Sequence, residues 1–322
     1  MKRTIILLAL LLTLTTAGCG FNQKAEVESL DKIIIQAPAA PPTAPLLKMI
    51  ESKPFGEKTA VELIFYKSVD EAITRVVKKE ADFTVLPVNV AAKLYSKGID
   101  IKLANVSTWG ILYLLSADES ITGWADLKGK EIYVGAQGAS PDIITRYLME
   151  KNNLPVKDGT LKYASSPEIA QMMIQGLVKT AVLPEPLVTK VLSKNPAVKV
   201  IKSYHQEWQL VEGKDSSLPQ AGMVVQKSFA ENHPRALETI QQAYREALEQ
   251  TVADPSAVSS LVENNFNIPA PFFEKAMARI NLKFAAAQEA KEDVSNYLSK
   301  LLQFSPDMVG GKLPDEEFYL AE

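Results

Sequence analysis

The stretch Gly-Trp-Ala-Asp-Leu-Lys-Gly-Lys-Glu-Ile-Tyr-Val-Gly-Ala-Gln-Gly-Ala-Ser-Pro-Asp, residues 123–142, decides the fold of this chain. Residues 123–130 are polar and rich in turn formers, and residues 131–135 then read as a short buried strand. Ser140-Pro141 follows, which predicts a helix with serine at the N-cap and proline at the first helical position. A new strand–helix series therefore starts here, and it predicts a second α/β unit.

An earlier series of the same kind precedes this stretch. Short apolar runs alternate there with amphipathic helical patterns, an order that is typical of parallel βαβ units. The strands that we expect in this part cover residues 32–36, 61–66, 82–86, 101–106 and 111–115.

The chain after residue 142 predicts where each lobe begins and ends. Three more strand patterns lead to a polar segment at 217–222, one further strand follows, and the remainder is almost entirely helical in pattern. We therefore expect an α/β protein of two lobes with a double crossover, at residues 116–123 and 217–222. Lobe one comprises 31–118 and 221–322, lobe two comprises 119–220, and the C-terminal helices pack on lobe one. The later strands are expected at 161–164, 180–183, 198–203 and 223–226.

The N-terminus has the layout of a secretory signal. Lys2 and Arg3 are followed by an apolar run at residues 5–12 and by small residues up to Gly18. The apolar run is shorter than the roughly 20 residues that span a bilayer. We therefore expect a signal peptide at 1–18, with a short transmembrane anchor as the alternative.

Cys19 is the only cysteine of the chain, so no internal disulfide can form. Thr16-Ala17-Gly18-Cys19 resembles a bacterial lipobox, in which the cysteine is acylated and becomes the mature N-terminus, although the motif prefers Leu where Thr16 stands. Two or more acyl chains anchor a protein stably to a membrane. The sequence thus predicts lipidation at Cys19, a lipidated tether at 19–30 and a position on the extracytoplasmic face of a bacterial cell membrane.

Composition excludes several classes of function. The chain is 47% hydrophobic and 23% charged, as expected of a globular protein, and the formal charge falls from −3 to −5 once residues 1–18 are removed. A mildly acidic protein has no electrostatic reason to bind nucleic acid. Apart from Cys19, only His205 and His233 offer typical zinc ligands, so we expect no metal site. No nucleotide-binding or nucleophile-elbow motif is present, so no cofactor and no enzymatic activity are expected, although carboxylate-based catalysis stays open.

Several segments, in this order, resemble the substrate-binding proteins of nitrate/sulfonate/taurine-type ABC importers and their thiamine-precursor-binding relatives. The resemblance spans nearly the whole mature chain and implies the fold of type II periplasmic binding proteins, with a ligand cleft between two α/β lobes. The segments that carry it are Ala81-Asp82-Phe83 with Pro87, residues 123–135, Gly138-Ala139-Ser140, Leu183-Pro184-Glu185-Pro186, residues 223–247 and 310–314 with Phe318-Tyr319.

The resemblance implies a solute-binding lipoprotein that captures a small molecule by hinge closure and delivers it to a permease driven by an ATPase. We expect it to be a monomer. Two alternatives use the same fold, since fold does not fix function. One is a biosynthetic enzyme, which the export signal disfavours, and the other is a surface ligand sensor.

Ligands of open α/β sheets bind beyond the carboxyl ends of the strands. In lobe one this rule selects three residues, each with a structural alternative. Thr43 could donate a hydroxyl or belong to a rigid turn, and Asn89 could contact ligand or cap a helix. Trp109 could stack on a planar ligand or belong to the core.

In lobe two the same rule selects the loop Gly138, Ala139 and Ser140, whose backbone N–H groups and hydroxyl would converge on an anionic or polar group. Glu185 could accept a hydrogen bond from an amine or a ring N–H, or hold a hinge, and Gln220 lies on the crossing back to lobe one. No arginine or lysine lies in these loops, so we expect a small polar or planar organic ligand, with a sulfonate- or nitrate-like anion as the alternative.

Overall fold

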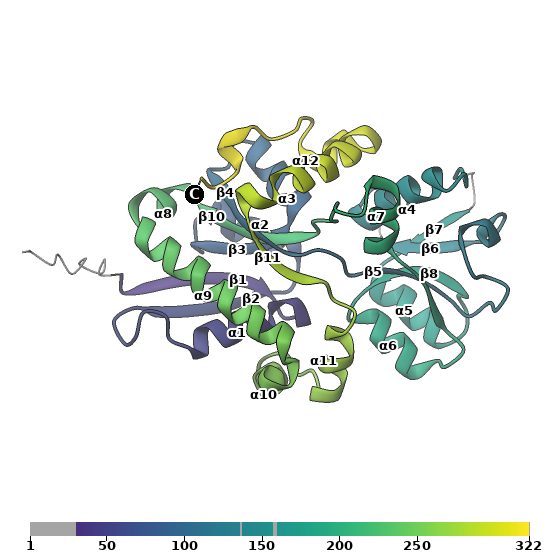
Figure 1. Cartoon of the computed structure of the whole chain (residues 1–322), viewed down its shortest axis with the longest axis horizontal. Coiled ribbons are helices and arrows are strands. Elements are labelled where there is room, and N and C mark those ends of the chain that lie inside the picture. The colour runs from purple at the N-terminus through teal and green to yellow at the C-terminus, as the bar shows by residue number, and fades with distance from the viewer. Residues whose placement is uncertain (1–29, 136, 157–159, 322) are drawn as a thin grey trace, which may run out of the picture.

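The computed structural model describes residues 30–135, 137–156 and 160–321. The chain folds into two lobes that lie side by side, each built around its own β-sheet (Figure 1). The predicted signal peptide, Cys19 and all but the last residue of the predicted tether lie outside the described residues. In the part of the chain that is described, no helix is long and apolar enough to cross a membrane.

Lobe one contains a six-stranded mixed sheet in the order β11-β4-β10-β3-β1-β2. Strand β1 is parallel to both of its neighbours, whereas β10 runs antiparallel between β3 and β4, and β11 runs antiparallel along the outer edge of β4. The strands are β1 (Lys32–Pro38), β2 (Ala60–Tyr66), β3 (Phe83–Pro87), β4 (Ile101–Thr108), β10 (Ala221–Gln226) and β11 (Leu282–Ala286).

Helices cover both faces of this sheet. On one face α1 and α9 bury Ile33 and Ile35 of β1, and α9 contributes Leu237, Ile240 and Tyr244 at helical spacing. On the other face lie α2, α3 and α12. The helices of lobe one are α1 (Ala44–Glu51), α2 (Val69–Val77), α3 (Val88–Ser96), α8 (Lys227–Asn232), α9 (Pro234–Ala253), α10 (Ser259–Phe266), α11 (Ala270–Met277) and α12 (Ala287–Phe304).

Lobe two contains a five-stranded sheet in the order β7-β6-β8-β5-β9. Helices α4 and α7 lie against one another, and α5 and α6 form a separate core with the sheet around Ile169 and Val188. The elements are β5 (Leu112–Ser116), β6 (Ile132–Gly135), α4 (Ser140–Lys151), β7 (Leu161–Ala164), α5 (Ser166–Ile174), β8 (Thr180–Pro184), α6 (Leu187–Lys194), β9 (Lys199–Ser203) and α7 (Tyr204–Glu212).

One strand lies in the other lobe from the one we expected. Strand β5 falls within the segment 31–118 that the sequence placed in lobe one, yet it pairs antiparallel with β8 and β9 in the sheet of lobe two. The chain therefore crosses at residues 109–111, directly after β4, and not at 116–123. An apolar run carries no information about which sheet its backbone will join, because that choice depends on pairing partners far along the chain.

The predicted parallel βαβ units are only part of each sheet, and the C-terminal part, expected to be almost entirely helical, contains one further strand. Strands β10 and β5 run antiparallel to their neighbours, and β11 interrupts the helices at residues 282–286. Its sequence, Leu-Lys-Phe-Ala-Ala, has good helix formers. Pairing with β4 overrides that local preference. The return of the C-terminal helices α9 and α12 to lobe one is confirmed, since both contact β11.

A continuous apolar core joins the two lobes along α12. Tyr297 of α12 lies 6.2 Å from Trp208 of α7, measured between ring centroids, and Trp208 lies 5.5 Å from Tyr147 of α4. These rings belong to the same buried cluster as the strands of lobe one. Figure 1 shows α12 reaching across the top of the molecule towards α4 and α7. Apolar packing thus holds the lobes together on this side.

Gly222 permits the close pairing of β10 with β4. A Cβ atom at this position would lie 2.1 Å from the carbonyl oxygen of Asn105, a backbone atom that cannot move without separating the strands. We predict that Gly222→Ala lowers the free energy of unfolding by about 3 kcal/mol, as overpacking of a core does. Gly123→Ala is the matched control, because a Cβ atom there meets nothing within 4 Å. Urea unfolding of both variants tests the prediction, and equal midpoints would contradict it.

Candidate functional site

The loops that follow β6 and β8 of lobe two contact lobe one. Ser140, the first residue of α4 after the first of these loops, has its hydroxyl oxygen 2.6 Å from the phenolic oxygen of Tyr297 on α12. Burial raises the pKa of Tyr297 to about 12, so the phenol is neutral near pH 7. The expectation that Ser140 caps its own helix was wrong, because Ala139 occupies the N-cap. The hydroxyl of Ser140 instead forms a bond that spans the two lobes.

The neighbouring Gly138 already has a hydrogen-bond partner. Its backbone N–H donates to Asp142 Oδ2 at 2.8 Å, and its φ of +75° is one that glycine adopts readily. Asp142 is buried and is balanced by Arg146, whose Nε lies 2.7 Å from Asp142 Oδ1. The carboxylate of Asp142 therefore engages one of the N–H groups that we expected to hold an anion.

Glu185, at the end of β8, forms the second contact between the lobes. The carboxylate is buried and accepts hydrogen bonds from the backbone N–H and the hydroxyl of Thr189, at 3.1 and 3.0 Å. Arg279 of lobe one approaches it, with Nη1 3.5 Å from Glu185 Oε1 and 3.1 Å from Thr189 Oγ1. Burial raises the pKa of Glu185, and the hydrogen bonds from Thr189 and the charge of Arg279 oppose this shift.

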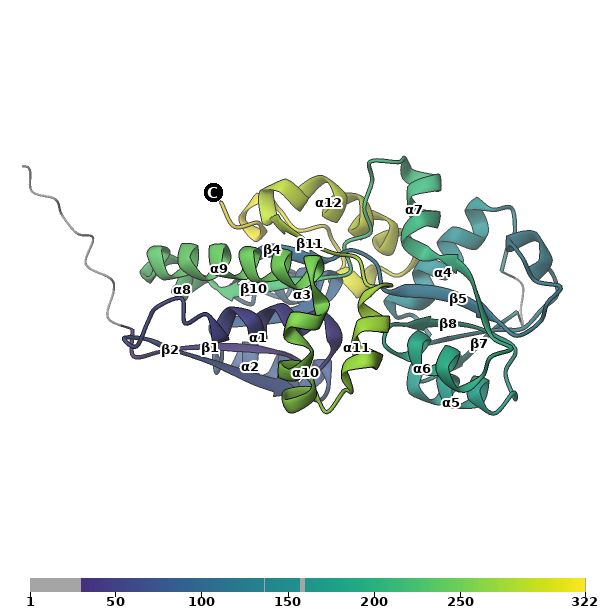
Figure 2. The same ribbon diagram turned by 60° about the horizontal axis from the view of Figure 1, so that its bottom comes forward.

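Arg279 adds to the lobe junction a cation that the sequences of the strand-end loops did not reveal. It follows α11, which lies between lobe one and α6 of lobe two (Figure 2). Its backbone carbonyl accepts a hydrogen bond from the hydroxyl of Tyr113 on β5, at 2.5 Å. Arg279 therefore binds lobe two through its side chain and its backbone. The expectation that the site lacks a basic residue holds only for the strand-end loops themselves.

Gln220 joins the two crossings. Its side-chain Oε1 accepts a hydrogen bond from the backbone N–H of Ile111 at 2.7 Å, and its own N–H donates to the carbonyl of Thr108 at 2.9 Å. Its carbonyl accepts from Val88 N at 3.1 Å, next to Asn89. Gln220 thus fixes the position of both crossing segments relative to the end of β3.

Thr43 and Asn89 follow the carboxyl ends of β1 and β3, as expected. The hydroxyl of Thr43 donates to the carbonyl of Pro38 at 2.7 Å, so it closes its own turn. Asn89 is buried at the start of α3, and its Oδ1 has no hydrogen-bond partner among the described residues. A buried acceptor without a donor is costly, and it indicates a position where a ligand donor would be stabilised.

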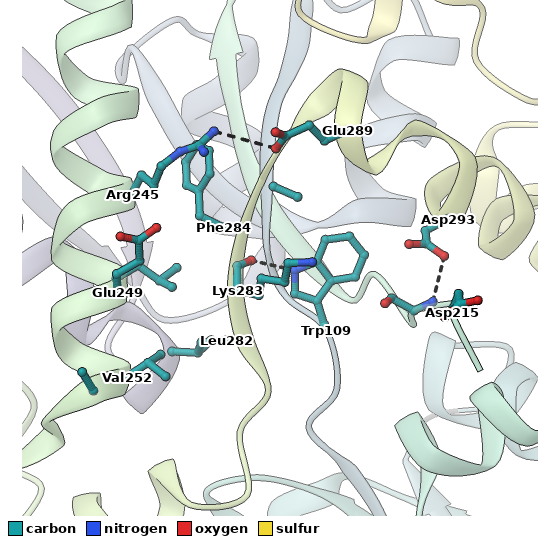
Figure 3. A pocket seen from close by; sticks show the side chains of 14 residues that line it. Trp109, Asp215, Arg245, Glu249, Val252, Leu282, Lys283, Phe284, Glu289 and Asp293 are labelled. Atoms are coloured by element: carbon teal, nitrogen blue, oxygen red, sulfur yellow. Dashed lines mark hydrogen bonds and ion pairs between the residues drawn. The ribbon is translucent and has the colours of Figure 1, made fainter. Parts of the chain in front are cut away.

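The indole of Trp109 faces a different cavity from the one expected between the lobes. Its indole lines a cavity of about 710 Å³ with residues of α9, β11 and α12 (Figure 3), and its Nε1 donates to the carbonyl of Lys283 at 2.7 Å. None of the other predicted site residues lines this cavity. Trp109 is 4% exposed. Of the described residues, no group of three or more His, Cys, Asp or Glu has an arrangement that could hold a metal ion.

Sequence reasoning missed Tyr297, Arg279 and Thr189. Thr189 had a local signal, since a carboxylate just before a helix commonly accepts an N–H from its first turn. Tyr297 lies 157 residues beyond Ser140 and Arg279 lies 90 residues beyond Thr189, so only the fold places them at the junction.

Two α/β lobes joined by a double crossing, with polar strand-end loops that bond across the junction, define a protein of the periplasmic-binding-protein fold. Residues 56–258 match the family model described as NMT1/THI5 like, and this chain belongs to that family. No curated protein matches the chain.

Solved structures share this fold. An ABC transporter from Parabacteroides distasonis is 28% identical, with a TM-score of 0.79 over 91% of this chain and 99% of that one. The periplasmic aliphatic sulphonate-binding protein SsuA from Escherichia coli is 16% identical, with a TM-score of 0.71 over 88% and 96%. The ligand-binding component of an ABC-type import system from Staphylococcus aureus is 14% identical, with a TM-score of 0.65 over 89% and 98%.

Removing the bond between Ser140 and Tyr297 tests whether it helps to hold the lobes together. We predict that Tyr297→Phe weakens the contact between the lobes by about 1 kcal/mol, which shifts an equilibrium between closed and open forms about fivefold. Resonance energy transfer between dyes on Lys58→Cys and Lys128→Cys, in a protein without Cys19, measures the interlobe distance.

Tyr204→Phe is the matched control for this experiment. The Tyr204 hydroxyl lies 2.8 Å from Thr145 Oγ1, and both residues belong to lobe two. Its loss is expected to cost similar stability and to leave the interlobe distance unchanged. An equal change of distance in both variants would argue against a bond that controls opening.

Proposed function

We propose that this protein is the extracytoplasmic solute-binding component of an ABC importer, and that it holds a small polar or planar organic ligand between its lobes. The observation that carries the proposal is the polar junction, where Ser140 meets Tyr297 and Glu185 meets Arg279. Such pairs lie on different lobes, so each can exchange its protein partner for a ligand when the lobes move. The similar proteins of the P. distasonis and S. aureus transport systems support this assignment.

The polar groups of the junction favour a particular ligand chemistry. Glu185 and Arg279 neutralise each other, so that part of the site has no net charge to attract a bare anion. Asn89 offers a buried acceptor, which requires an N–H or O–H donor. Nitrate carries no such donor. A heterocycle or hydroxylated organic molecule satisfies both conditions, whereas a sulfonate, which SsuA is named for binding, would have to recruit Arg279 from Glu185.

The protein acts as a monomer anchored to the outer face of the membrane through acylated Cys19, and closure of the lobes presents a surface that the permease, with its ATPase, recognises. The site is proposed to bind its ligand without chemical change.

A thermal-shift screen of the soluble protein from residue 20 onwards tests the binding function. We expect a hit among heterocycles, small organic acids or sulfonates, because a ligand at a hundred times its dissociation constant stabilises the fold by about 2.7 kcal/mol. Asn89→Leu should weaken binding of that hit about tenfold by removing the acceptor. Isothermal titration calorimetry measures the affinity, and mass spectrometry of the recovered ligand detects any turnover.

Asn105→Leu is the control for Asn89→Leu. Asn105 is equally a buried asparagine whose Oδ1 has no partner among the described residues, but it lies inside the lobe-one sheet and bonds Gln241. This variant should lose stability and keep its affinity. Turnover of a compound without stable binding would instead favour an enzyme, and equal losses of affinity would remove Asn89 from the site.

Lipid anchoring is tested separately in a bacterial host. We predict that the protein incorporates labelled palmitate, that Cys19→Ala abolishes this labelling, and that Thr16→Leu retains it, because leucine is the residue the lipobox motif prefers there. Intact mass should place the mature N-terminus at residue 19. A chain that keeps Met1 and carries no label would point to the transmembrane-anchor alternative.

A further inference from the structure

The segment between β6 and α4 carries an anion of its own. Asp142, in the first turn of α4, is 1% exposed, and its Oδ2 accepts a hydrogen bond from the backbone N–H of Gly138 at 2.8 Å. A carboxylate in this place is stabilised by the positive end of the helix dipole. Asp142 therefore lies where we expected the backbone N–H groups of residues 138–140 to receive a polar or anionic group of the ligand.

Two side-chain donors complete the surroundings of this carboxylate. Arg146 Nε lies 2.7 Å from Asp142 Oδ1, and the hydroxyl of Tyr163 on β7 donates to the same oxygen at 3.0 Å. Burial and the charge of Asp142 raise the pKa of Tyr163, so the phenol keeps its proton. Arg146 Nη2 also donates to the Tyr163 oxygen, at 2.5 Å. Gly138, Arg146 and Tyr163 thus present donors that suit an oxyanion, and Asp142 supplies it.

The loop after β8 has the same construction. Glu185 precedes α6, is 3% exposed and accepts a hydrogen bond from the backbone N–H of Thr189 in the first turn of that helix, at 3.1 Å. Its arginine partner, Arg279, comes from lobe one. Asp142 and Arg146 both belong to α4, so their contact does not depend on the position of the lobes. Of the two carboxylates, Asp142 is therefore the permanent one.

Asp142 belongs to the segment of lobe two that meets lobe one. Ser140, two residues before it, forms the interlobe bond to Tyr297. A ligand that reaches lobe two at this point meets an N–H group that is already engaged and a carboxylate beside it. An oxyanion carries acceptors only and would have to displace Asp142 from its donors, whereas an uncharged polar group can bond the surrounding groups without doing so.

We propose that Asp142 determines the specificity of the interlobe site, because it fills from within the protein the position that an anionic head group would need at the start of α4. The ligand then contacts lobe two through an uncharged polar group. This inference rests on the binding function proposed above and narrows its ligand class to neutral organic molecules with N–H or O–H donors, to the exclusion of sulfonates.

Two probes that share a phenyl ring and a sulfonyl group but differ in charge test this role. In isothermal titration calorimetry, the soluble protein from residue 20 onwards should bind neutral benzenesulfonamide more tightly than benzenesulfonate. Asp142→Ala leaves the donors of Gly138, Arg146 and Tyr163 without their acceptor. Its affinity for benzenesulfonate should therefore rise by about tenfold or more relative to its affinity for benzenesulfonamide. A purely structural cap would lower the unfolding temperature when removed and create no affinity for an anion.

Asp126→Ala is the matched control. Asp126 Oδ2 likewise accepts hydrogen bonds from backbone N–H groups of lobe two, those of Thr122 and Gly123 at 2.9 and 3.0 Å, but this aspartate is exposed. Its removal should leave the preference between the probes unchanged. Circular dichroism verifies that each variant is folded. Should Asp142→Ala not fold, Asp142→Asn keeps an acceptor oxygen, loses the charge and should shift the preference in the same direction.

The outcomes separate this inference from the binding function itself. A wild-type preference for benzenesulfonate, no gain of benzenesulfonate affinity on removal of Asp142, or an equal gain in Asp126→Ala would overturn the role of Asp142. A sulfonate hit in the thermal-shift screen would support the binding function and overturn this role as well. A screen without any hit, combined with the gain in Asp142→Ala, would leave Asp142 as the internal anion and count against the binding function.

Discussion

The arrangement of the lobes depends on two chain segments that run side by side between the sheets, and Gln220 holds them together. Its N–H and its side-chain oxygen bond the first crossing at Thr108 and Ile111, so a single residue fixes the register of the two crossings. A third segment joins them, because Asn281 accepts from Trp109 N at 2.8 Å and donates to Gly110 O at 3.1 Å. Gly110 is needed there, since a Cβ atom would lie 2.6 Å from His205 Cβ. Motion between the lobes must therefore be taken up by these few backbone positions.

The two flanks of this junction are built from different interactions, and this limits how the lobes can separate. On the α12 side, buried rings pack from lobe to lobe, and Glu212 accepts hydrogen bonds from Tyr147 and from Asn296, the latter at 2.9 Å. On the α11 side, Arg279 supplies the polar bonds to Thr189, Glu185 and Tyr113. Opening the first flank exposes apolar surface to water, whereas the polar groups of the second can be rehydrated. The structure therefore favours a separation that begins on the Arg279 side and reaches the Ser140–Tyr297 bond, beside the packed rings of α12, only as the lobes open further.

Local sequence signals predicted the elements well and their pairing poorly. Local signals place β1, β3, β6 and α5 within a few residues of their observed bounds. These signals are serine before a helix, proline at its start and short apolar runs, and they work because caps and periodicity act over one or two turns. Strand β11 escaped this reasoning, since residues 282–286 are good helix formers and become a strand only by pairing with β4. Strand β5 was recognised as a strand but assigned to the wrong sheet, for the same reason. Trp109, directly after β4, could from its sequence either stack on a ligand or belong to the core, and the structure buries its ring against β11 and α9.

In the candidate site, too, local sequence does not reveal partners that come from distant parts of the chain. Here the missing partners change the chemistry that the sequence suggested. The strand-end rule placed Ser140 and Glu185 correctly at the lobe junction, but it could not supply their partners, because Tyr297 and Arg279 arrive from the C-terminal part of the chain. Judged from the loops alone, the site contains one carboxylate and no cation, which argues against an anion by charge. With Arg279 in place the pair is neutral, and the argument against a bare anion moves to Asn89, whose buried oxygen needs a donor. Charge alone therefore does not select the ligand of this site. The proposed selection rests on hydrogen-bond donors, which a polar organic molecule provides and an oxyanion such as nitrate does not.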